Sequence, residues 1–189
     1  KKQEIYKMMK VLNNKFTYVI EFTGTPRTGK TTLINNLYDF FKKGKFNTKV
    51  LEEFTTSQRY KKEIYPRLKI EYKNVVKSEI PRYILNNLSD TIDKNYDVII
   101  IDRSLFDRMI WMDRLYSKNG VSKEEYDNYI DEYIPIIKNK IDIIIGLYTD
   151  SLTSLRRDYT ANASLEKRTF LNEGNINEYN DSLMNIKEL

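Results

Sequence analysis

The chain has 189 residues, of which 40% are hydrophobic and 31% are charged, and its net charge is +5. This length and composition are typical of one globular domain, and the absence of cysteine and histidine excludes disulfides and thiolate or imidazole metal sites. Any acid–base chemistry must therefore use a carboxylate, a lysine or a tyrosine. No stretch approaches the ~20 apolar residues of a membrane span, and residues 1–6 lack the apolar region of a secretory signal, so we expect a cytoplasmic protein with no membrane partner.

The sequence opens with a polar segment and then a short apolar run. Residues 1–14 are lysine-rich with one weak apolar stripe, which suits either a short helix or a flexible leader. Residues 18–22 have the apolar character of a buried strand. The spacing of the apolar residues at positions 33, 37, 40 and 41 then predicts a helix that ends near Gly44.

A glycine-rich loop joins this strand to this helix. Its sequence, Gly-Thr-Pro-Arg-Thr-Gly-Lys-Thr over residues 24–31, stands in the strand-to-helix context that a phosphate-binding loop requires. Glycines let backbone N–H groups turn toward phosphate oxygens, and the helix N-terminus adds positive partial charge. Lys30 is expected to reach the β and γ phosphates, and Thr31 to hold Mg²⁺. The residues predicted to bind ATP here are Gly24, Thr25, Pro26, Arg27, Thr28, Gly29, Lys30, Thr31 and Thr32.

The rest of the chain alternates strands with helical stretches. Strands are predicted at 48–51, 96–102 and 141–148, helices at 105–116 and 122–137, and two or more further helices over 55–95, broken near Pro66 and Pro81. The helix predicted at 122–137 opens with Ser122-Lys-Glu-Glu125, the sequence pattern of a capping box. This alternation predicts one domain over residues 1–189, a three-layer α/β/α sandwich with a parallel sheet, of the P-loop NTPase type.

In such a sheet, ligands gather at the carboxyl ends of the strands, where three charged residues are predicted. Asp102 would hold Mg²⁺ directly or through water, or else serve as a turn or cap. Glu53 would accept a proton from an attacking hydroxyl or hold a sugar, or else be a solvated charge. Arg103 would contact the phosphate oxygens, or else form a surface ion pair.

Other basic residues could also act on the phosphates. Arg27 can reach over the phosphates or toward the acceptor, with a solvent-facing side chain as the alternative. A basic lid over residues 156–168 could close on the phosphates and exclude water, or carry charge on exposed helical faces. The predicted phosphate ligands in this lid are Arg156, Arg157, Lys167 and Arg168.

Three short motifs together resemble the deoxynucleoside kinases and the related thymidylate kinases. The loop at 24–32 resembles the arginine-containing phosphate loop of one thymidylate kinase subtype. The segment that begins Asp102-Arg103-Ser104 is similar to the Glu-Arg-Ser segment of deoxynucleoside kinases, and residues 147–156 look like their strand, turn and arginine helix before the lid. The resemblance covers residues 19–179.

The resemblance implies that the γ-phosphoryl group of ATP passes to a nucleoside or a nucleoside monophosphate, with Mg²⁺ as cofactor. It implies that Glu53 deprotonates a sugar hydroxyl and that Arg103 binds phosphate. We therefore expect the catalytic residues to be Lys30, Glu53, Arg103 and Arg27, and the acceptor ligands to be Glu53, Gln58, Arg82, Arg103 and Arg108. The family has another helix and a final strand after the lid, whereas nothing beyond Asn180 is strand-like.

Two other functions stay open at this point. A nucleotide-binding switch or regulatory ATPase would act through a protein partner, with the tyrosine- and lysine-rich residues 60–83 as its surface. A kinase that acts on a polynucleotide end would use the positive charge, but no basic groove alternating with aromatic residues favours nucleic acid as a partner. A homodimer is compatible with the sequence, which does not define the oligomeric state.

Overall fold

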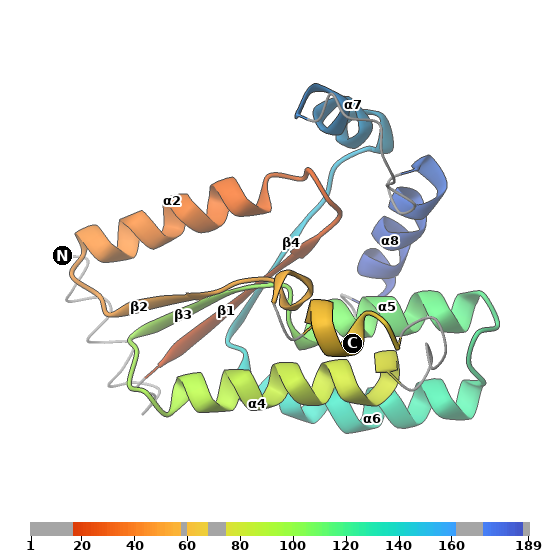
Figure 1. Cartoon of the computed structure of the whole chain (residues 1–189), viewed down its shortest axis with the longest axis horizontal. Helices are drawn as coiled ribbons and strands as arrows, with labels where there is room; N and C mark the ends of the chain where they lie inside the picture. Colours follow the sequence, from red (N-terminus) through yellow and green to blue (C-terminus); the bar gives the residue numbers. More distant parts are fainter. Residues whose placement is uncertain (1–16, 58–59, 68–74, 162–171, 187–189) are drawn as a thin grey trace.

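The computed structural model describes residues 17–57, 60–67, 75–161 and 172–186, and its centre is a four-stranded parallel sheet (Figure 1). The strands are β1 (Tyr18–Gly24), β2 (Thr48–Leu51), β3 (Val98–Asp102) and β4 (Ile143–Leu147), in the order β2-β3-β1-β4. Because all the pairings are parallel, the carboxyl ends of the strands lie at one edge of the sheet. Strand β1, which leads into the glycine-rich loop, lies between β3 and β4.

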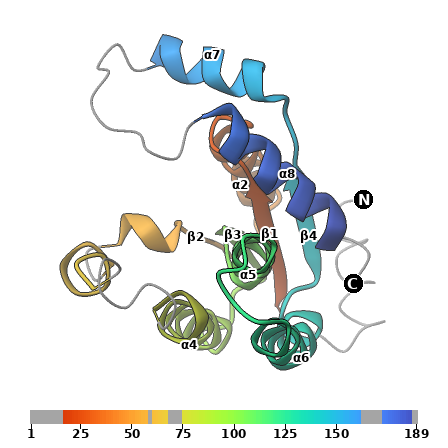
Figure 2. The same ribbon diagram turned by 90° about the vertical axis from the view of Figure 1, so that its right-hand side faces the viewer.

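Helices cover both faces of this sheet. Helix α2 (Lys30–Lys43) packs on one face against β1, β2 and β3, and Figure 2 shows α4 (Ile80–Ile92), α5 (Leu105–Ser117) and α6 (Lys123–Lys140) on the other. Successive side chains of a strand point to opposite faces, so Ile20 and Phe22 join one core with Ile34 of α2, while Val19 joins the other core with Met109 of α5. The predicted three-layer α/β/α sandwich is confirmed.

Short turns and two further helices complete the described residues. The segment η1 (Phe54–Thr56) is a 3₁₀ turn, η2 (Tyr60–Ile64) and η3 (Val75–Glu79) are π-helical turns, and α7 (Ser151–Ala161) and α8 (Glu173–Ile186) follow β4. Helix α8 packs against α5, α7 and β1. It was not among the predicted elements, although its buried apolar residues recur at helical spacing, at Ile176, Tyr179, Leu183 and Ile186.

Two predicted helix boundaries are confirmed. Helix α6 begins after Ser122 with both bonds of the capping box, since the Glu125 N–H donates to Ser122 Oγ at 3.1 Å and the Ser122 N–H donates to Glu125 Oε2 at 2.8 Å. Helix α2 ends next to Gly44, whose N–H donates to the Phe40 carbonyl at 3.1 Å. The positive φ of this turn, however, falls on Lys45 at 63°.

The predicted break near Pro81 is confirmed, since η3 ends at Glu79 and Pro81 lies in the first turn of α4, where its missing N–H is tolerated. The predicted start of the strand at 96–102 needed correction. Strand β3 begins at Val98, because the carboxylate of the preceding Asp97 accepts the Asn47 N–H at 2.8 Å in a loop.

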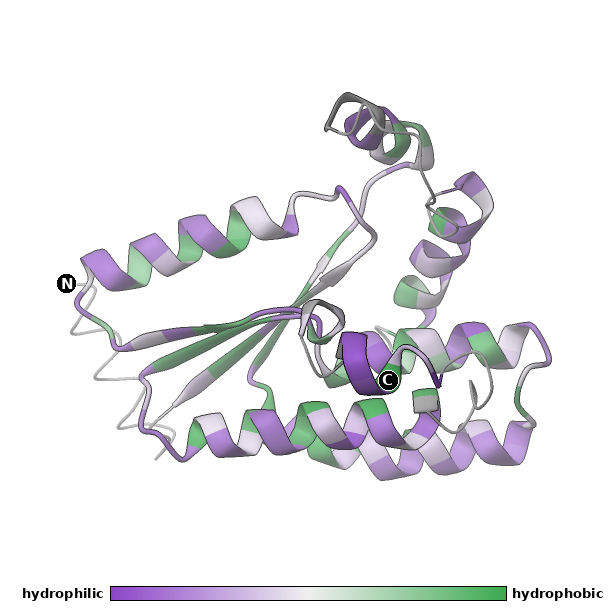
Figure 3. Ribbon diagram, viewed as in Figure 1, coloured by the Kyte–Doolittle hydropathy of each residue, from purple (hydrophilic) through white to green (hydrophobic). Residues whose placement is uncertain are grey.

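The hydropathy of the elements follows these layers. Figure 3 shows strongly hydrophobic strands between helices that carry hydrophilic residues on their outer faces. Among the residues described, no helix is both long and apolar enough to cross a membrane.

Candidate functional site

The glycine-rich loop turns sharply between β1 and α2. Gly24 has a φ of 137° and Gly29 a φ of 97°, a region that residues with a Cβ rarely adopt. A Cβ on Gly24 would lie 2.3 Å from the carbonyl oxygen of Leu147, so the end of β4 also requires glycine there. Gly29 is the N-cap of α2 and offers no side chain to its first N–H groups. These N–H groups are therefore placed to bind an anion.

Lys30 is buried inside this loop. Its Nζ donates to the carbonyl oxygens of Gly24 and Thr25, each at 2.9 Å, and the side chain is 7% exposed. Burial, followed by the nearby charge of Arg103, lowers the pKa of Lys30 to about 8. An ammonium group in this dry environment would be stabilised by a phosphate oxygen, as the prediction for Lys30 requires.

Asp102 ends β3 at the point where Phe22 faces it on β1. Its Oδ1 is buried, with no hydrogen-bond partner among the described residues. Burial raises the pKa of Asp102, while the charges of Lys30 and Arg103 oppose that rise. A buried carboxylate oxygen beside a phosphate loop fits Mg²⁺, which binds one or two carboxylates together with phosphates and water. Across the described part of the chain, no group of three or more acidic side chains could hold a metal ion.

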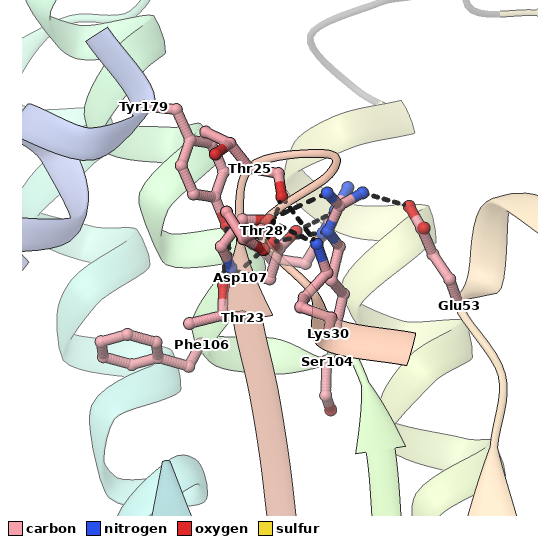
Figure 4. Close-up of polar contacts among 12 residues, drawn as sticks. Thr23, Thr25, Thr28, Lys30, Glu53, Ser104, Phe106, Asp107 and Tyr179 are labelled. Carbon is pink, nitrogen blue, oxygen red and sulfur yellow. Dashed lines mark hydrogen bonds and ion pairs between the residues drawn. The ribbon is translucent and has the colours of Figure 1, made fainter. Parts of the chain in front are cut away.

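Arg103 connects the end of β2 to the phosphate loop. Its Nη1 donates to Glu53 Oε1 at 2.7 Å and its Nη2 donates to the Gly24 carbonyl at 2.9 Å (Figure 4). The Arg103 side chain is only 13% exposed, so the pair with Glu53 is not the surface ion pair considered above. Burial opposes the charge of Arg103, but Asp107 and Glu53 outweigh burial and raise its pKa. The backbone of Arg103 has a φ of 60°, a strained value of the kind found at functional sites.

Helix α7, whose residues 156–161 begin the predicted lid, contacts the phosphate loop. Ser154 Oγ donates to the Pro26 carbonyl at 2.7 Å, and Arg27 Nε donates to Asp158 Oδ1 at 2.7 Å. Arg157 donates to the carbonyl of Arg27 at 3.2 Å. The Arg27 side chain thus pairs with Asp158 of α7 and stays 34% exposed. A cavity of about 610 Å³ lies here, lined by Arg27, Thr28, Gly29, Lys30, Thr31, Thr32, Leu33, Asn36 and Arg157.

Two of the expected acceptor residues, Arg82 and Arg103, line cavities beside Tyr83. Arg103 and Tyr83 line a small cavity of about 50 Å³ together with Glu52 and Phe54. The ring centroids of Phe54 and Tyr83 lie 4.7 Å apart. Arg82 lines a neighbouring polar cavity of about 500 Å³ that also includes Tyr83. Tyr83, which sequence reasoning missed, has no local signal beyond its place on an amphipathic helix.

Other predicted residues do not line these cavities or are not described. Arg108 is buried on α5 and donates to Asp107. Arg156 is exposed on α7. Gln58, Lys167, Arg168 and the leader at 1–14 lie outside the described residues, as does the second part of the lid.

One buried acidic residue near the loop, Glu21, was not predicted as a site residue. Glu21, inside β1, accepts the N–H groups of Ser104 at 2.7 Å and Asp107 at 2.9 Å, and thereby caps α5. Burial raises the pKa of Glu21 to about 7 despite these hydrogen bonds. The signal in the sequence was a lone glutamate in an otherwise apolar strand.

A phosphate loop after β1, with a strand-end aspartate on the adjacent strand β3, defines the fold and site of a P-loop NTPase. The chain belongs to the AAA domain family, whose model matches residues 19–180. No curated protein matches it in sequence.

Solved structures of deoxyadenosine kinase from M. mycoides are similar to this chain. The structure with bound dATP has a TM-score of 0.59 and 24% identity, and the alignment covers 90% of this chain and 84% of that one. The structure with bound dCTP has a TM-score of 0.57 and 26% identity, with 90% and 83% covered. The structure with the products dCMP and a flexible dCDP has a TM-score of 0.58 and 23% identity, with the same coverage. The resemblance to deoxynucleoside kinases is thus confirmed, and so is the kinase class of phosphotransferase.

Proposed function

We propose that this protein is a kinase that uses ATP and Mg²⁺ to phosphorylate a nucleoside or a nucleoside monophosphate. The observation that carries the proposal is the position of Arg103, which contacts both Glu53 and the Gly24 carbonyl of the phosphate loop. A single side chain thus joins the donor side of the site to a carboxylate at the end of β2. The likeness to deoxyadenosine kinase structures supports a nucleoside as the acceptor.

In this mechanism the residues act by position and charge. The loop N–H groups and Lys30 bind the phosphates of ATP, and Arg103 and Arg27 offset charge on the transferring group. Glu53 accepts the proton of the attacking hydroxyl. Thr31 and Asp102 would hold Mg²⁺, which would neutralise charge on the phosphate oxygens.

The proposal also covers the domain organisation, the lid and the cellular location of the protein. We propose that residues 1–189 form one domain, that the lid over 156–168 closes on ATP, and that the protein acts in the cytoplasm on a small-molecule acceptor. Light scattering during gel filtration will determine whether it is a monomer or a homodimer.

The decisive experiment is a transfer assay with γ-labelled ATP against a panel of acceptors. The panel contains the deoxynucleosides, their monophosphates and a 5′-hydroxyl oligonucleotide. We expect label to move to at least one nucleoside or monophosphate. Transfer to the oligonucleotide alone would make the protein a polynucleotide kinase, whereas hydrolysis without any transfer would favour a regulatory ATPase.

The variant Glu53→Gln tests the proposed base. It keeps a hydrogen-bonding group beside Arg103 but cannot accept the proton, so we expect kcat to fall about 10²-fold or more, with little change in ATP binding. Glu124→Gln, which changes an exposed glutamate on α6, is the matched control and should keep the full rate. An unchanged kcat in Glu53→Gln would return this residue to a structural partner of Arg103.

A further inference from the structure

A buried hydroxyl joins helix α8 to the phosphate loop. Tyr179 is 1% exposed, and its OH lies 2.7 Å from Thr23 Oγ1 and accepts the Gly24 N–H at 3.3 Å. The same OH donates to Asp107 Oδ1 (Figure 4). One side chain of helix α8 thus contacts β1, the first residue of the loop and α5.

The peptide groups of Gly24 are held from both sides. Tyr179 accepts the N–H, while Lys30 and Arg103 donate to the carbonyl, each at 2.9 Å. The two donors are the cations that face the phosphates in the proposed function. The orientation of Gly24 therefore determines where both cations lie.

Asp107 extends this set of contacts to Arg103. The carboxylate is fully buried, and it accepts the Thr23 hydroxyl at 3.1 Å as well as the Tyr179 hydroxyl. Arg103 Nε lies 3.6 Å from the same Oδ1 atom. The Arg108 and Arg103 charges outweigh the effect of burial and keep the pKa of Asp107 below its usual value. Asp107 is thus a buried anion that faces Arg103, and Tyr179 orients it.

We propose that Tyr179 is a positioning residue for phosphoryl transfer, and that its hydroxyl fixes Gly24 directly and Arg103 through Asp107. The inference rests on the proposed function for its main readout. Removal of the hydroxyl leaves the Gly24 N–H without this acceptor and Asp107 without this donor, so that Lys30 and Arg103 lose their exact placement. A small displacement of such groups costs far more in the transition state than in the ground state.

The test is Tyr179→Phe, with Tyr129→Phe as the matched control. Tyr129 is also buried, 5% exposed, and its ring packs against Tyr133 on the same helix, α6. We expect Tyr179→Phe to lower kcat about 10-fold while the ATP KM changes less than about threefold. Both variants should lower the melting temperature by a similar amount, but Tyr129→Phe should leave kcat unchanged. Equal kcat values for Tyr179→Phe and the wild type would overturn the proposal.

A double-mutant cycle separates positioning from a general loss of structure. In the background of Arg103→Gln, the kcat penalty of Tyr179→Phe should shrink several-fold, because the hydroxyl no longer has Arg103 to place. An undiminished penalty would mean that Tyr179 does not act through Arg103 and would overturn the route through Asp107. Asp107→Asn, which keeps the shape of the side chain, is expected to give the same kcat loss as Tyr179→Phe.

The same comparison works if the proposed acceptor is wrong. If the wild type transfers phosphate to no acceptor, the rate of ATP hydrolysis replaces the rate of transfer as the readout. The roughly tenfold loss in Tyr179→Phe and the intact rate in Tyr129→Phe are expected for hydrolysis as well, since both reactions need Lys30 and Arg103 in place. Equal hydrolysis rates in the two variants would overturn the positioning role itself.

Discussion

Several ionisable side chains around the phosphate loop are buried, and their charges are balanced by neighbours instead of water. Lys30 donates to two carbonyls, and Arg103 pairs with Glu53. Asp107 accepts hydrogen bonds from a tyrosine, a threonine and an arginine. Such groups cost free energy in the folded protein unless their partners compensate. Some of these buried charged side chains are therefore expected to lower the free energy of unfolding of the protein.

Lys30→Met should make the protein inactive and more stable. Folding lowers the pKa of Lys30 from 10.5 to about 8, so below pH 8 the folded protein holds a charge that costs stability, a cost that fades as pH rises from 8 to 10.5. Methionine has no charge to bury, and we expect a net gain on the order of 1 kcal/mol after the loss of two hydrogen bonds. Urea unfolding at pH 7 measures this. A loss of stability would mean that the two carbonyl bonds outweigh burial.

Glu21→Gln should remove a component of the pH dependence of stability. The pKa of Glu21 is raised from 4.5 to about 7 by burial, so the folded protein binds a proton more tightly than the unfolded chain. The contribution of Glu21 is therefore fully present below pH 4.5 and is lost as pH rises through about 7, by up to ~3 kcal/mol. Unfolding in urea at a series of pH values should show that the difference between wild type and variant falls across this window. Parallel curves would contradict the assignment.

At the scale of elements, the loop depends on how closely β1 and β4 approach each other. Gly24 pairs with Leu147 in the register of these two strands, and the carbonyl of Leu147 occupies the place of a side chain. Gly29, at the other end of the loop, has no atom within 4 Å of its would-be Cβ. Gly24 is thus required for both its backbone angle and its lack of a side chain, whereas Gly29 is required for its backbone angle alone.

Alanine at these two positions should separate the two requirements. Gly29→Ala should lower the free energy of unfolding by about 1–2 kcal/mol, the cost of placing alanine at a positive φ. Gly24→Ala must also displace the backbone of β4, and we expect a loss of more than about 3 kcal/mol or failure to fold. Thermal or urea unfolding of both variants gives the order. A Gly24→Ala protein as stable as Gly29→Ala would show that β4 can move away from the loop.

At the scale of the whole molecule, the site is assembled from segments far apart in the chain. The loop after β1, the ends of β2 and β3, helix α7 and helix α8 all contribute a contact. A ligand that binds this assembled site, but not the unfolded chain, must stabilise the entire fold.

Binding of ATP with Mg²⁺ should therefore raise the melting temperature. At a nucleotide concentration of 100 times Kd, the gain is about 2.7 kcal/mol, or roughly 5–10 °C for a chain of this size. We expect a smaller shift without Mg²⁺ and almost none in Lys30→Ala. Asp102→Asn should respond equally to ATP with and without Mg²⁺. If Mg²⁺ still increased the shift in that variant, Asp102 would not be its ligand.

Much of this arrangement could be predicted because its signals are local. The phosphate loop, the capping box at Ser122 and the strand-end position of Asp102 each depend on a few consecutive residues. Helix periodicity and strand hydrophobicity likewise depend on neighbours in the chain. The fold class and the nucleotide-binding end of the sheet therefore followed from the sequence.

The contacts between distant segments did not follow from it. No local pattern indicates that Tyr179 contacts Thr23, 156 positions away, or that Arg103 pairs with Glu53 and not with solvent. These contacts exist because parallel strand order brings separate strand ends to one edge, and because helix α8 packs across β1 and α5. The sequence alone determined which chemical groups are present and the elements that carry them. Tertiary packing decided which of those groups share a buried site, because burial and long-range pairing arise only when the layers come together.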